Sequence, residues 1–224
     1  MKEQNEYGSF LLELANEQEE KVKRYERMNR YAKKGQIVFT GSSLMEMFPI
    51  NELAQGLGIS YNIYNRGIGG FVIDQLLNTL EPCIFALEPK YLFTNIGTNN
   101  MNEPDYRLEV LLRKYEELLV QVRRQLPEVQ IFLMAYYPVN PGISTMPYLK
   151  EVFRYRTNAA ICEANEGLRR LAQKQGCSYL DLNAGITDEK GNLRKEYTAE
   201  GLHMYVDGYV EVLKAMIPIL KSLQ

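Results

Sequence analysis

Residues 36–47, "QIVFTGSSLMEM", run from an apolar stretch through two adjacent serines into sequence typical of a helix. The apolar residues predict a buried strand that ends near Gly41. Ser42 and Ser43 then lie at a strand-to-helix turn. A serine there can act as a nucleophile, or it can cap the helix by accepting hydrogen bonds from its first N–H groups. The stretch alone leaves both interpretations open.

Short apolar runs alternate with longer helical stretches along the rest of the chain. The predicted strands cover residues 36–41, 60–66, 90–97, 129–137 and 177–182, and the main predicted helices cover 9–33, 105–126, 148–175 and 207–224. Strands separated by helices imply right-handed crossovers and a parallel sheet covered on both faces. The predicted fold class is α/β, a three-layer α/β/α sandwich with about five parallel strands.

The chain has 224 residues, of which 46% are hydrophobic, and this suits one large domain. We expect residues 1–34 to form a helical extension packed on or beside that domain, which comprises residues 35–224. The apolar stripe of the extension is irregular, so it could also serve self-association, and a homo-oligomer stays open.

Charge and cysteine usage limit the classes of partner. The 26 basic and 28 acidic residues leave no positive field for nucleic acid, and we expect a small-molecule partner. The three cysteines form no CxxC pair, and no apolar run suggests a signal sequence or stable membrane insertion. We therefore expect a reduced protein of cytoplasmic location.

His203 is the chain's single histidine and lies in "TAEGLHMYVDGY", just before the last predicted helix. Glu200, three residues earlier, can reach the imidazole, orient it and fix its tautomer. A structural role is the common alternative for an isolated histidine. If His203 is a base, it needs a nucleophile, and Ser43 suits this role better than Ser42 because it falls at the turn into the helix, where its own N–H is also free.

Two further strand ends can supply donors to an oxyanion. "NRGIGG" (65–70) follows the second strand, and its glycines let the backbone turn an N–H toward a neighbour. It does not fit the G-x-G-x-x-G dinucleotide pattern. Asn99 follows the third strand in "IGTNN", where its carboxamide can donate. Each of these residues also has an ordinary interpretation as turn chemistry.

In combination, these motifs resemble the blocks of the SGNH hydrolases, also called GDSL-type esterases and lipases. "GSSL" resembles the first block, "NRGIGG" the second, "GTNN" the third and "EGLH" the last. The resemblance implies a flavodoxin-like fold and an esterase. It gives Ser43 as nucleophile, His203 as base, and the N–H groups of Ser43 and Gly70 with the Asn99 carboxamide as oxyanion hole. "RTNAAI", "YLDLN" and "DGYVEV" are similar to the bacterial branch that hydrolyses small esters.

Three positions depart from the family pattern. Ser42 and Asn100 replace aspartates that support the nucleophile and the catalytic asparagine. Glu200 stands where the triad aspartate belongs. A glutamate is longer by one methylene yet can still reach an imidazole N–H, so we predict a Ser43–His203–Glu200 triad. If Glu200 points to solvent instead, the site is a dyad.

The expected reaction is hydrolysis of a short-chain ester, acetyl in the first place, such as an O-acetylated sugar, without metal or organic cofactor. Arg66 could contact an anion on the alcohol part or pair with a local acid. Four apolar side chains could line an acyl slot or simply fill the core: Met45, Ile68, Met101 and Met204. The alternatives from other classes are a phosphate- or flavin-binding flavodoxin-like protein and a non-catalytic carbohydrate binder.

Overall fold

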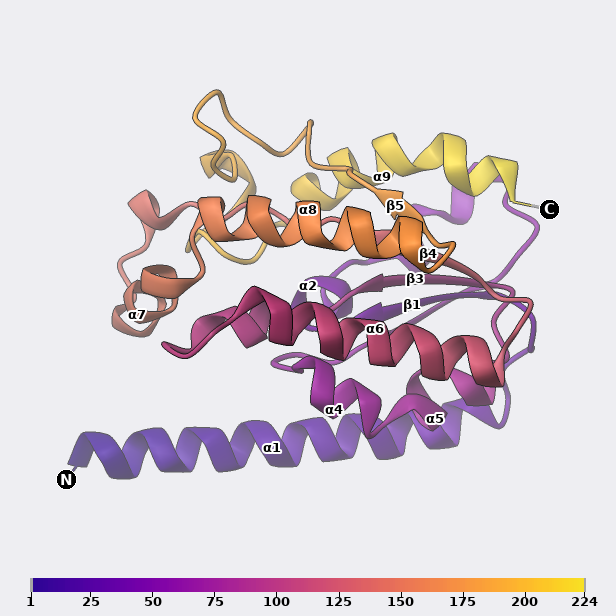
Figure 1. Cartoon of the computed structure of the whole chain (residues 1–224), viewed down its shortest axis with the longest axis horizontal. Coiled ribbons are helices and arrows are strands. Elements are labelled where there is room, and N and C mark those ends of the chain that lie inside the picture. The colour runs from indigo at the N-terminus through magenta and orange to yellow at the C-terminus, as the bar shows by residue number, and fades with distance from the viewer. Residues whose placement is uncertain (1, 224) are drawn as a thin grey trace.

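A five-stranded parallel sheet forms the centre of the protein (Figure 1). The computed structural model describes residues 2–223, and side chains from residue 12 onward. The strands are β1 (Ile37–Gly41), β2 (Ile63–Gly67), β3 (Tyr91–Asn95), β4 (Gln130–Met134) and β5 (Ser178–Leu180), in the order β2-β1-β3-β4-β5. The predicted three-layer α/β sandwich is confirmed.

Helices cover both faces of the sheet (Figure 1). On one face lie α4 (Ile73–Leu77), α5 (Leu80–Cys83), α6 (Leu108–Gln125) and α8 (Asn158–Lys174). On the other lie α2 (Ser43–Glu46), α3 (Ile50–Leu53) and α9 (Val206–Ser222). The short 3₁₀ turns are η1 (Gln55–Leu57), η2 (Phe85–Leu87), η3 (Thr98–Asn102), η4 (Pro141–Ile143) and η5 (Lys195–Tyr197).

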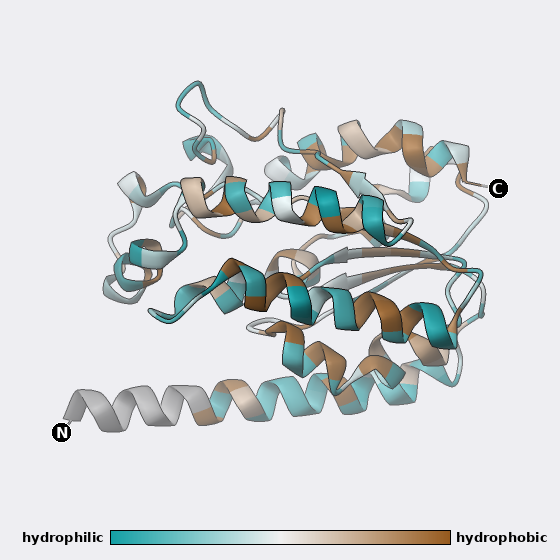
Figure 2. Ribbon diagram, viewed as in Figure 1, coloured by the Kyte–Doolittle hydropathy of each residue, from teal (hydrophilic) through white to brown (hydrophobic). Residues whose placement is uncertain are grey.

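Alternation along the strands divides the core into two layers. In β1, Val38 faces α6 and α8, while Ile37 and Phe39 face α2 and α9, and all three are fully buried. Both faces of a parallel sheet are covered, so its strands carry apolar side chains on both. Figure 2 shows that the helices over the sheet carry both hydrophobic and hydrophilic residues, and their buried hydrophobic residues belong to the same two layers.

Three phenylalanines stack across the face of the sheet that α2 and α9 cover. Phe39, Phe93 and Phe132 occupy the same level of β1, β3 and β4 because the strand register pairs them. The ring centroids of Phe93 lie 4.7 Å from Phe39 and 4.4 Å from Phe132, with the rings nearly parallel. This stack fixes the relative height of β1, β3 and β4, and Ser43 and Asn99 follow the first two of these strands.

The predicted single helix over residues 148–175 is wrong. The structure has two helices, α7 (Pro147–Tyr155) and α8, with a break at Arg156 and Thr157. Thr157 starts α8 as its N-cap, and its hydroxyl accepts a hydrogen bond from the Ala160 N–H. Serine and threonine favour this position because their side chains satisfy a first-turn N–H group. The break turns the Arg156 side chain into the interior, where it is 2% exposed.

The N-terminal helix α1 (Lys2–Asn29) runs along one edge of the molecule, beside α4 and α5 (Figure 1). Its C-terminal end is anchored by Asn29, whose Nδ2 donates to Pro82 O at 2.8 Å. The Asn29 Oδ1 accepts two hydrogen bonds from the Arg66 guanidinium, which also lies over the Tyr25 ring. Arg66 therefore joins α1 to β2.

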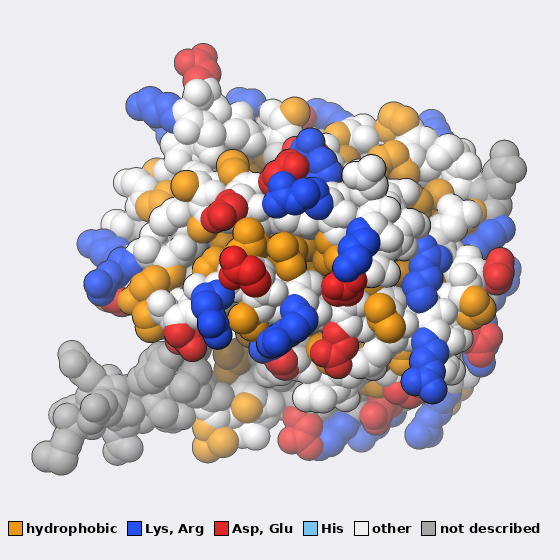
Figure 3. Space-filling view, in the orientation of Figure 1, with side chains coloured by type: hydrophobic (Ala, Val, Ile, Leu, Met, Phe, Trp, Pro, Cys, Tyr) orange, Lys and Arg blue, Asp and Glu red, His pale blue; other side chains and the backbone are white. Residues whose placement is uncertain are grey.

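Positive and negative side chains are interspersed over the visible face of the molecule (Figure 3). No helix in the described part of the chain is both long and apolar enough to cross a membrane.

Phe93→Ala is expected to lower the free energy of unfolding by about 3–5 kcal/mol, because it removes the middle ring of a buried stack and leaves a cavity. Urea denaturation followed by circular dichroism measures this. Val120→Ala on the exposed side of α6 is the matched control, and it should change the free energy by less than about 0.5 kcal/mol. Equal effects of the two substitutions would contradict the importance of the stack.

Candidate active site

Ser43 lies at the carboxyl end of β1, where the backbone turns sharply into α2. Gly41 comes so close to β3 that a Cβ built on it would lie 2.1 Å from Asn95 O. Only glycine fits there, and Ser43 follows as the first residue of the helix. A side chain at this position projects from a helix N-terminus, where backbone dipoles favour negative charge.

Ser43, His203 and Glu200 form one hydrogen-bonded line, although Ser43 and His203 are 160 positions apart in the chain. The Ser43 Oγ lies 3.0 Å from His203 Nε2, and His203 Nδ1 lies 2.8 Å from Glu200 Oε1. A carboxylate can only accept, so Nδ1 carries the ring proton and Nε2 is left to accept the serine hydroxyl. This is the tautomer that a base next to a serine requires.

Glu200 is held by its own turn as well as by the imidazole. Its Oε1 also accepts the His203 backbone N–H at 2.6 Å, while Thr198 Oγ1 accepts the N–H groups of Glu200 and Gly201. Burial by itself raises the pKa of Glu200, but the hydrogen bonds from His203 outweigh burial and leave the pKa below its usual value. Glu200 is thus an anion at neutral pH, and it points to His203 and not to solvent.

Three groups are candidate donors to an ester carbonyl oxygen at Ser43: the N–H groups of Ser43 and Gly70 and the Asn99 carboxamide. Among the described residues, none accepts the backbone N–H of Ser43 or of Gly70. Gly70 has φ of 78°, and a Cβ built on its neighbour Gly69 would lie 3.9 Å from Ser43 Cβ, so this loop adjoins the serine. The Asn99 carboxamide donates one N–H to Phe71 O at 3.0 Å and keeps a second for a ligand.

Arg156 is a residue of this site that the sequence did not predict. Its Nη2 donates to Asn99 Oδ1 at 2.6 Å, and its Nε donates to Asn102 Oδ1 at 3.0 Å. Arginine has donors only, so it fixes the Asn99 oxygen on its own side and turns the NH₂ group the other way. The available signal was "RTN" (156–158), where a threonine and an asparagine interrupt a helical pattern.

Arg156 is a buried cation. No carboxylate in the described part of the chain lies within ion-pair distance of it. Burial lowers the pKa of its guanidinium to about 10, so it stays charged at neutral pH. Its positive charge lies behind the Asn99 carboxamide and strengthens that amide as a donor to a negative oxygen.

The two positions that lack the family's supporting aspartate behave differently. Asn100 keeps a supporting contact, because its Oδ1 accepts the N–H of Ile73 in the first turn of α4. The Ser42 side chain does not cap α2, which excludes the capping alternative for this serine. Its backbone carbonyl accepts the first helical N–H groups, while its hydroxyl is buried and has no partner among the described residues.

The residues predicted to contact substrate lie in the interior. Met45, Ile68 and Met101 are fully buried, and Met204 is 5% exposed, so these four belong to the two core layers and do not form an open acyl slot. Arg66 is 3% exposed and already bound to Asn29, which leaves it facing α1 and not a ligand. Neither expected role of Arg66 is found, because its partner is the amide oxygen of Asn29 and not an acid or a ligand.

The family is established by sequence comparison. The GDSL-like Lipase/Acylhydrolase family model matches residues 47–210. The chain belongs to this family. It is an acylhydrolase that cleaves carboxylic esters. The match begins four residues after Ser43, so the assignment of the serine depends on the geometry above and on the GSSL motif.

Known proteins similar to this acylhydrolase differ in length and in name. A solved Streptococcus pneumoniae protein described as a platelet activating factor is 31% identical, with a TM-score of 0.83, and the alignment covers 96% of this chain and 98% of that one. Platelet-activating factor acetylhydrolase IB subunit alpha1 of Bos taurus is 25% identical over 85% of this chain and 77% of its own length. An N-acylneuraminate cytidylyltransferase of Escherichia coli is 23% identical over 88% of this chain. The acylhydrolase spans only 43% of that relative.

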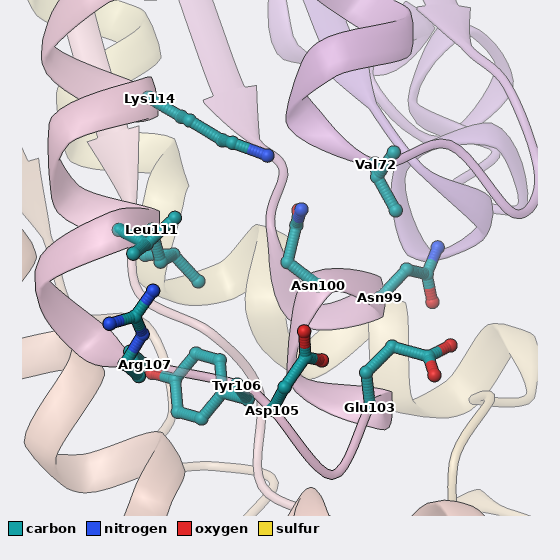
Figure 4. Close-up of a pocket in the computed structure, with 10 residues that line it drawn as sticks. Val72, Asn99, Asn100, Glu103, Asp105, Tyr106, Arg107, Leu111 and Lys114 are labelled. Atoms are coloured by element: carbon teal, nitrogen blue, oxygen red, sulfur yellow. The ribbon is translucent and has the colours of Figure 1, made fainter.

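A cavity of about 250 Å³ opens beside Asn99 (Figure 4). Asn99, Asn100, Glu103 and Asp105 line it from η3 and the turn that follows, and α6 closes the opposite side with Leu111 and Lys114. Val72, Tyr106, Arg107 and Val110 complete the lining. Carboxylates, carboxamides and cations therefore line the cavity together with the apolar side chains of Val72, Val110 and Leu111. Among the described residues, no cluster of histidine, cysteine and acidic side chains could hold a metal ion.

Asn99→Ala is expected to lower kcat on ester hydrolysis by about 10²-fold to 10³-fold with little change in KM, because it removes one donor to the oxyanion. Arg156→Met should lower kcat by about 10-fold or more through the same amide. Because Arg156 acts through Asn99, the double variant should be no slower than Asn99→Ala alone. Steady-state kinetics on p-nitrophenyl acetate measures all three.

Methionine fills a similar volume and removes a buried charge, so the Arg156→Met variant should keep its fold. Thermal unfolding checks this. Arg156→Lys retains the charge but loses the second hydrogen bond, and it serves as the matched control. If the effects of Asn99→Ala and Arg156→Met multiply, the two residues act independently and the positioning role of Arg156 is wrong.

Proposed function

We propose that this acylhydrolase removes short acyl groups, acetyl in the first place, from a polar alcohol, with Ser43 as the nucleophile. The observation that carries the proposal is the line from Ser43 Oγ through His203 to Glu200, at 3.0 and 2.8 Å. It places a base with the required tautomer next to a serine at a helix N-terminus.

In the first half of the reaction, His203 Nε2 takes the Ser43 proton as Oγ attacks the ester carbonyl carbon. The negative carbonyl oxygen is held by the N–H groups of Ser43 and Gly70 and by Asn99. Glu200 stabilises the charged imidazole. His203 then gives its proton to the departing alkoxide, which leaves as the alcohol, and the acyl group stays on Ser43.

In the second half, His203 takes a proton from water, and the resulting hydroxide attacks the acyl carbon. The tetrahedral intermediate collapses, Ser43 Oγ leaves and receives the proton from His203, and a carboxylic acid is released. Each step uses groups of this chain and water.

Two observations support a short acyl group and a polar alcohol. The apolar side chains next to the catalytic loops are packed in the core, so a long acyl chain would have to displace them. The cavity beside Asn99 is lined by groups that bind hydroxyls, which suits a sugar or a similar alcohol. The word acetylhydrolase in the name of the Bos taurus relative agrees with the acyl part.

A phosphate or flavin binder on the same fold, and a non-catalytic carbohydrate binder, explain less. Neither gives a role to a serine hydroxyl that is already hydrogen-bonded to an oriented imidazole.

Ser43→Ala is expected to abolish turnover of p-nitrophenyl acetate and labelling by a fluorophosphonate probe, because both need the hydroxyl. Glu200→Gln should keep the labelled serine but lower kcat by about 10²-fold to 10⁴-fold, since the imidazolium loses its counter-charge. Mass spectrometry locates the label, and steady-state kinetics gives kcat.

Ser42→Ala is the matched control for the serine, and it should remain labelled at Ser43. Unchanged activity of Ser43→Ala would end the proposal. A change of only a few-fold in Glu200→Gln would leave a working dyad in place of the triad.

The kcat/KM for p-nitrophenyl esters should fall by about 10-fold or more from acetate to octanoate, because close-packed side chains resist displacement by a longer acyl chain. Each rate is divided by the rate of alkaline hydrolysis of the same ester, which removes differences in intrinsic reactivity. A maximum at octanoate would contradict the preference for short acyl groups.

A further inference from the structure

The loop that carries Gly70 is a tight turn with glycine at both central positions. The Phe71 N–H donates to Ile68 O at 3.2 Å, so residues 68–71 form a β-turn around Gly69 and Gly70. Gly70 has φ of 78°, close to the value of about +80° that defines the third residue of a type II turn.

The peptide group between Gly69 and Gly70 can exist in two orientations. Type I and type II turns differ mainly by a flip of this central peptide, and glycine on both sides allows either orientation at little steric cost. A flip would reverse the direction of the Gly70 N–H, which is one of the candidate oxyanion donors. A functional site therefore needs something that holds this peptide in place.

Gln18 of α1 makes the contact that holds it. Its Nε2 donates to Gly69 O at 2.8 Å, and its side chain is buried, with 7% exposed. The carbonyl of Gly69 and the N–H of Gly70 belong to one planar group and point in opposite directions. By binding the carbonyl on the α1 side, Gln18 turns the N–H away from α1.

Gln18 is itself fixed by a second glutamine. Its Oε1 accepts from Gln75 Nε2 at 2.8 Å, and Gln75 Oε1 accepts the Val72 N–H at 3.0 Å. This path runs from the Gly69 carbonyl through Gln18 and Gln75 to the N–H of Val72, directly after the turn. Each of the two side-chain amides is hydrogen-bonded through both its oxygen and its nitrogen, so neither can rotate without losing a bond.

Two neighbouring contacts hold the rest of the loop, one from Tyr25 of α1 and one from Glu46 of α2. The Tyr25 hydroxyl donates to Gly67 O at 2.7 Å, and burial raises the pKa of Tyr25 to about 12, so it keeps its proton at neutral pH. The Gly69 N–H donates to Glu46 Oε2, and the other oxygen of Glu46 pairs with Lys21 Nζ at 2.7 Å. The loop is thus bound to α1 directly at Gly67 O and Gly69 O, and through Glu46 of α2 at the Gly69 N–H.

We propose that Gln18 is a positioning residue of the oxyanion hole, which it serves by locking the Gly69–Gly70 peptide in the orientation that presents the Gly70 N–H to the reacting oxygen. The inference depends on the proposed function, because it concerns the same ester-hydrolysing site. It also makes α1, which precedes the family-matched residues 47–210, part of the catalytic apparatus and not only an edge helix.

The test compares Gln18→Leu and Gln18→Glu with the unmodified full chain on p-nitrophenyl acetate. Leucine removes both hydrogen bonds, while glutamate can still accept from Gln75 but cannot donate to Gly69 O. We expect both to lower kcat by about 10-fold to 100-fold with KM nearly unchanged. Affinity for phenylboronic acid, whose serine adduct places an oxygen in the same hole, should fall in proportion to kcat/KM.

Two controls separate positioning from general stability. Asn29→Ala loosens the C-terminal end of α1, where Asn29 binds Pro82 and Arg66 but no group of the turn 68–71. It should therefore lower the melting temperature but leave kcat within about three-fold. Gln75→Met leaves the Gln18 bond to Gly69 intact, so it should reduce kcat less than Gln18→Leu.

If kcat in all four variants follows the melting temperature, or if the Gln18 variants keep full kcat and full boronate affinity, the inference is wrong. Failure of the proposed function looks different: the unmodified protein would then neither hydrolyse the ester nor react with a fluorophosphonate at Ser43.

Discussion

The close approach of Gly41 to Asn95 O is the contact on which the site's geometry depends. It brings the carboxyl ends of β1 and β3 together, and the Ser42 N–H adds a hydrogen bond to the same carbonyl at 3.4 Å. Because both strands run in the same direction, the loops that follow them emerge side by side. The nucleophile candidate of one loop and the amide donor of the next are neighbours for this reason, and the aromatic stack below maintains the register.

Two charged residues of the site are buried without full pairing. Arg156 is buried with only amide oxygens as acceptors, and Glu200 has one carboxylate oxygen that is buried without a partner among the described residues. Both arrangements cost folding energy, since a buried charge is stabilised best by a direct counter-charge. Placed where an anion and then an imidazolium form during ester hydrolysis, such groups lower the energy of the charged states. Stability lost here is compensated by the two large apolar layers.

The sequence predicted the elements that follow from local pattern and left out those that depend on distant contacts. Short apolar runs located all five strands. The family blocks pointed to Ser43, Gly70 and Asn99, which follow the neighbouring strands β1, β2 and β3, and to His203, which lies just before α9 and meets Ser43. Arg156 was hidden because its region reads as continuous helix until Thr157 is recognised as a cap. Gln18 was hidden because its partner is 51 residues away. The sequence left open whether the methionines next to motif residues line a slot or fill the core, since sequence proximity does not reveal which side of a turn a side chain faces.

Asn100 has a consequence for how the molecule responds to acid. A carboxylate that caps a helix loses its acceptor strength when it takes up a proton, whereas a carboxamide does not titrate. With an amide oxygen on the Ile73 N–H, the junction between η3 and α4 keeps the same hydrogen bond at every pH that the fold tolerates.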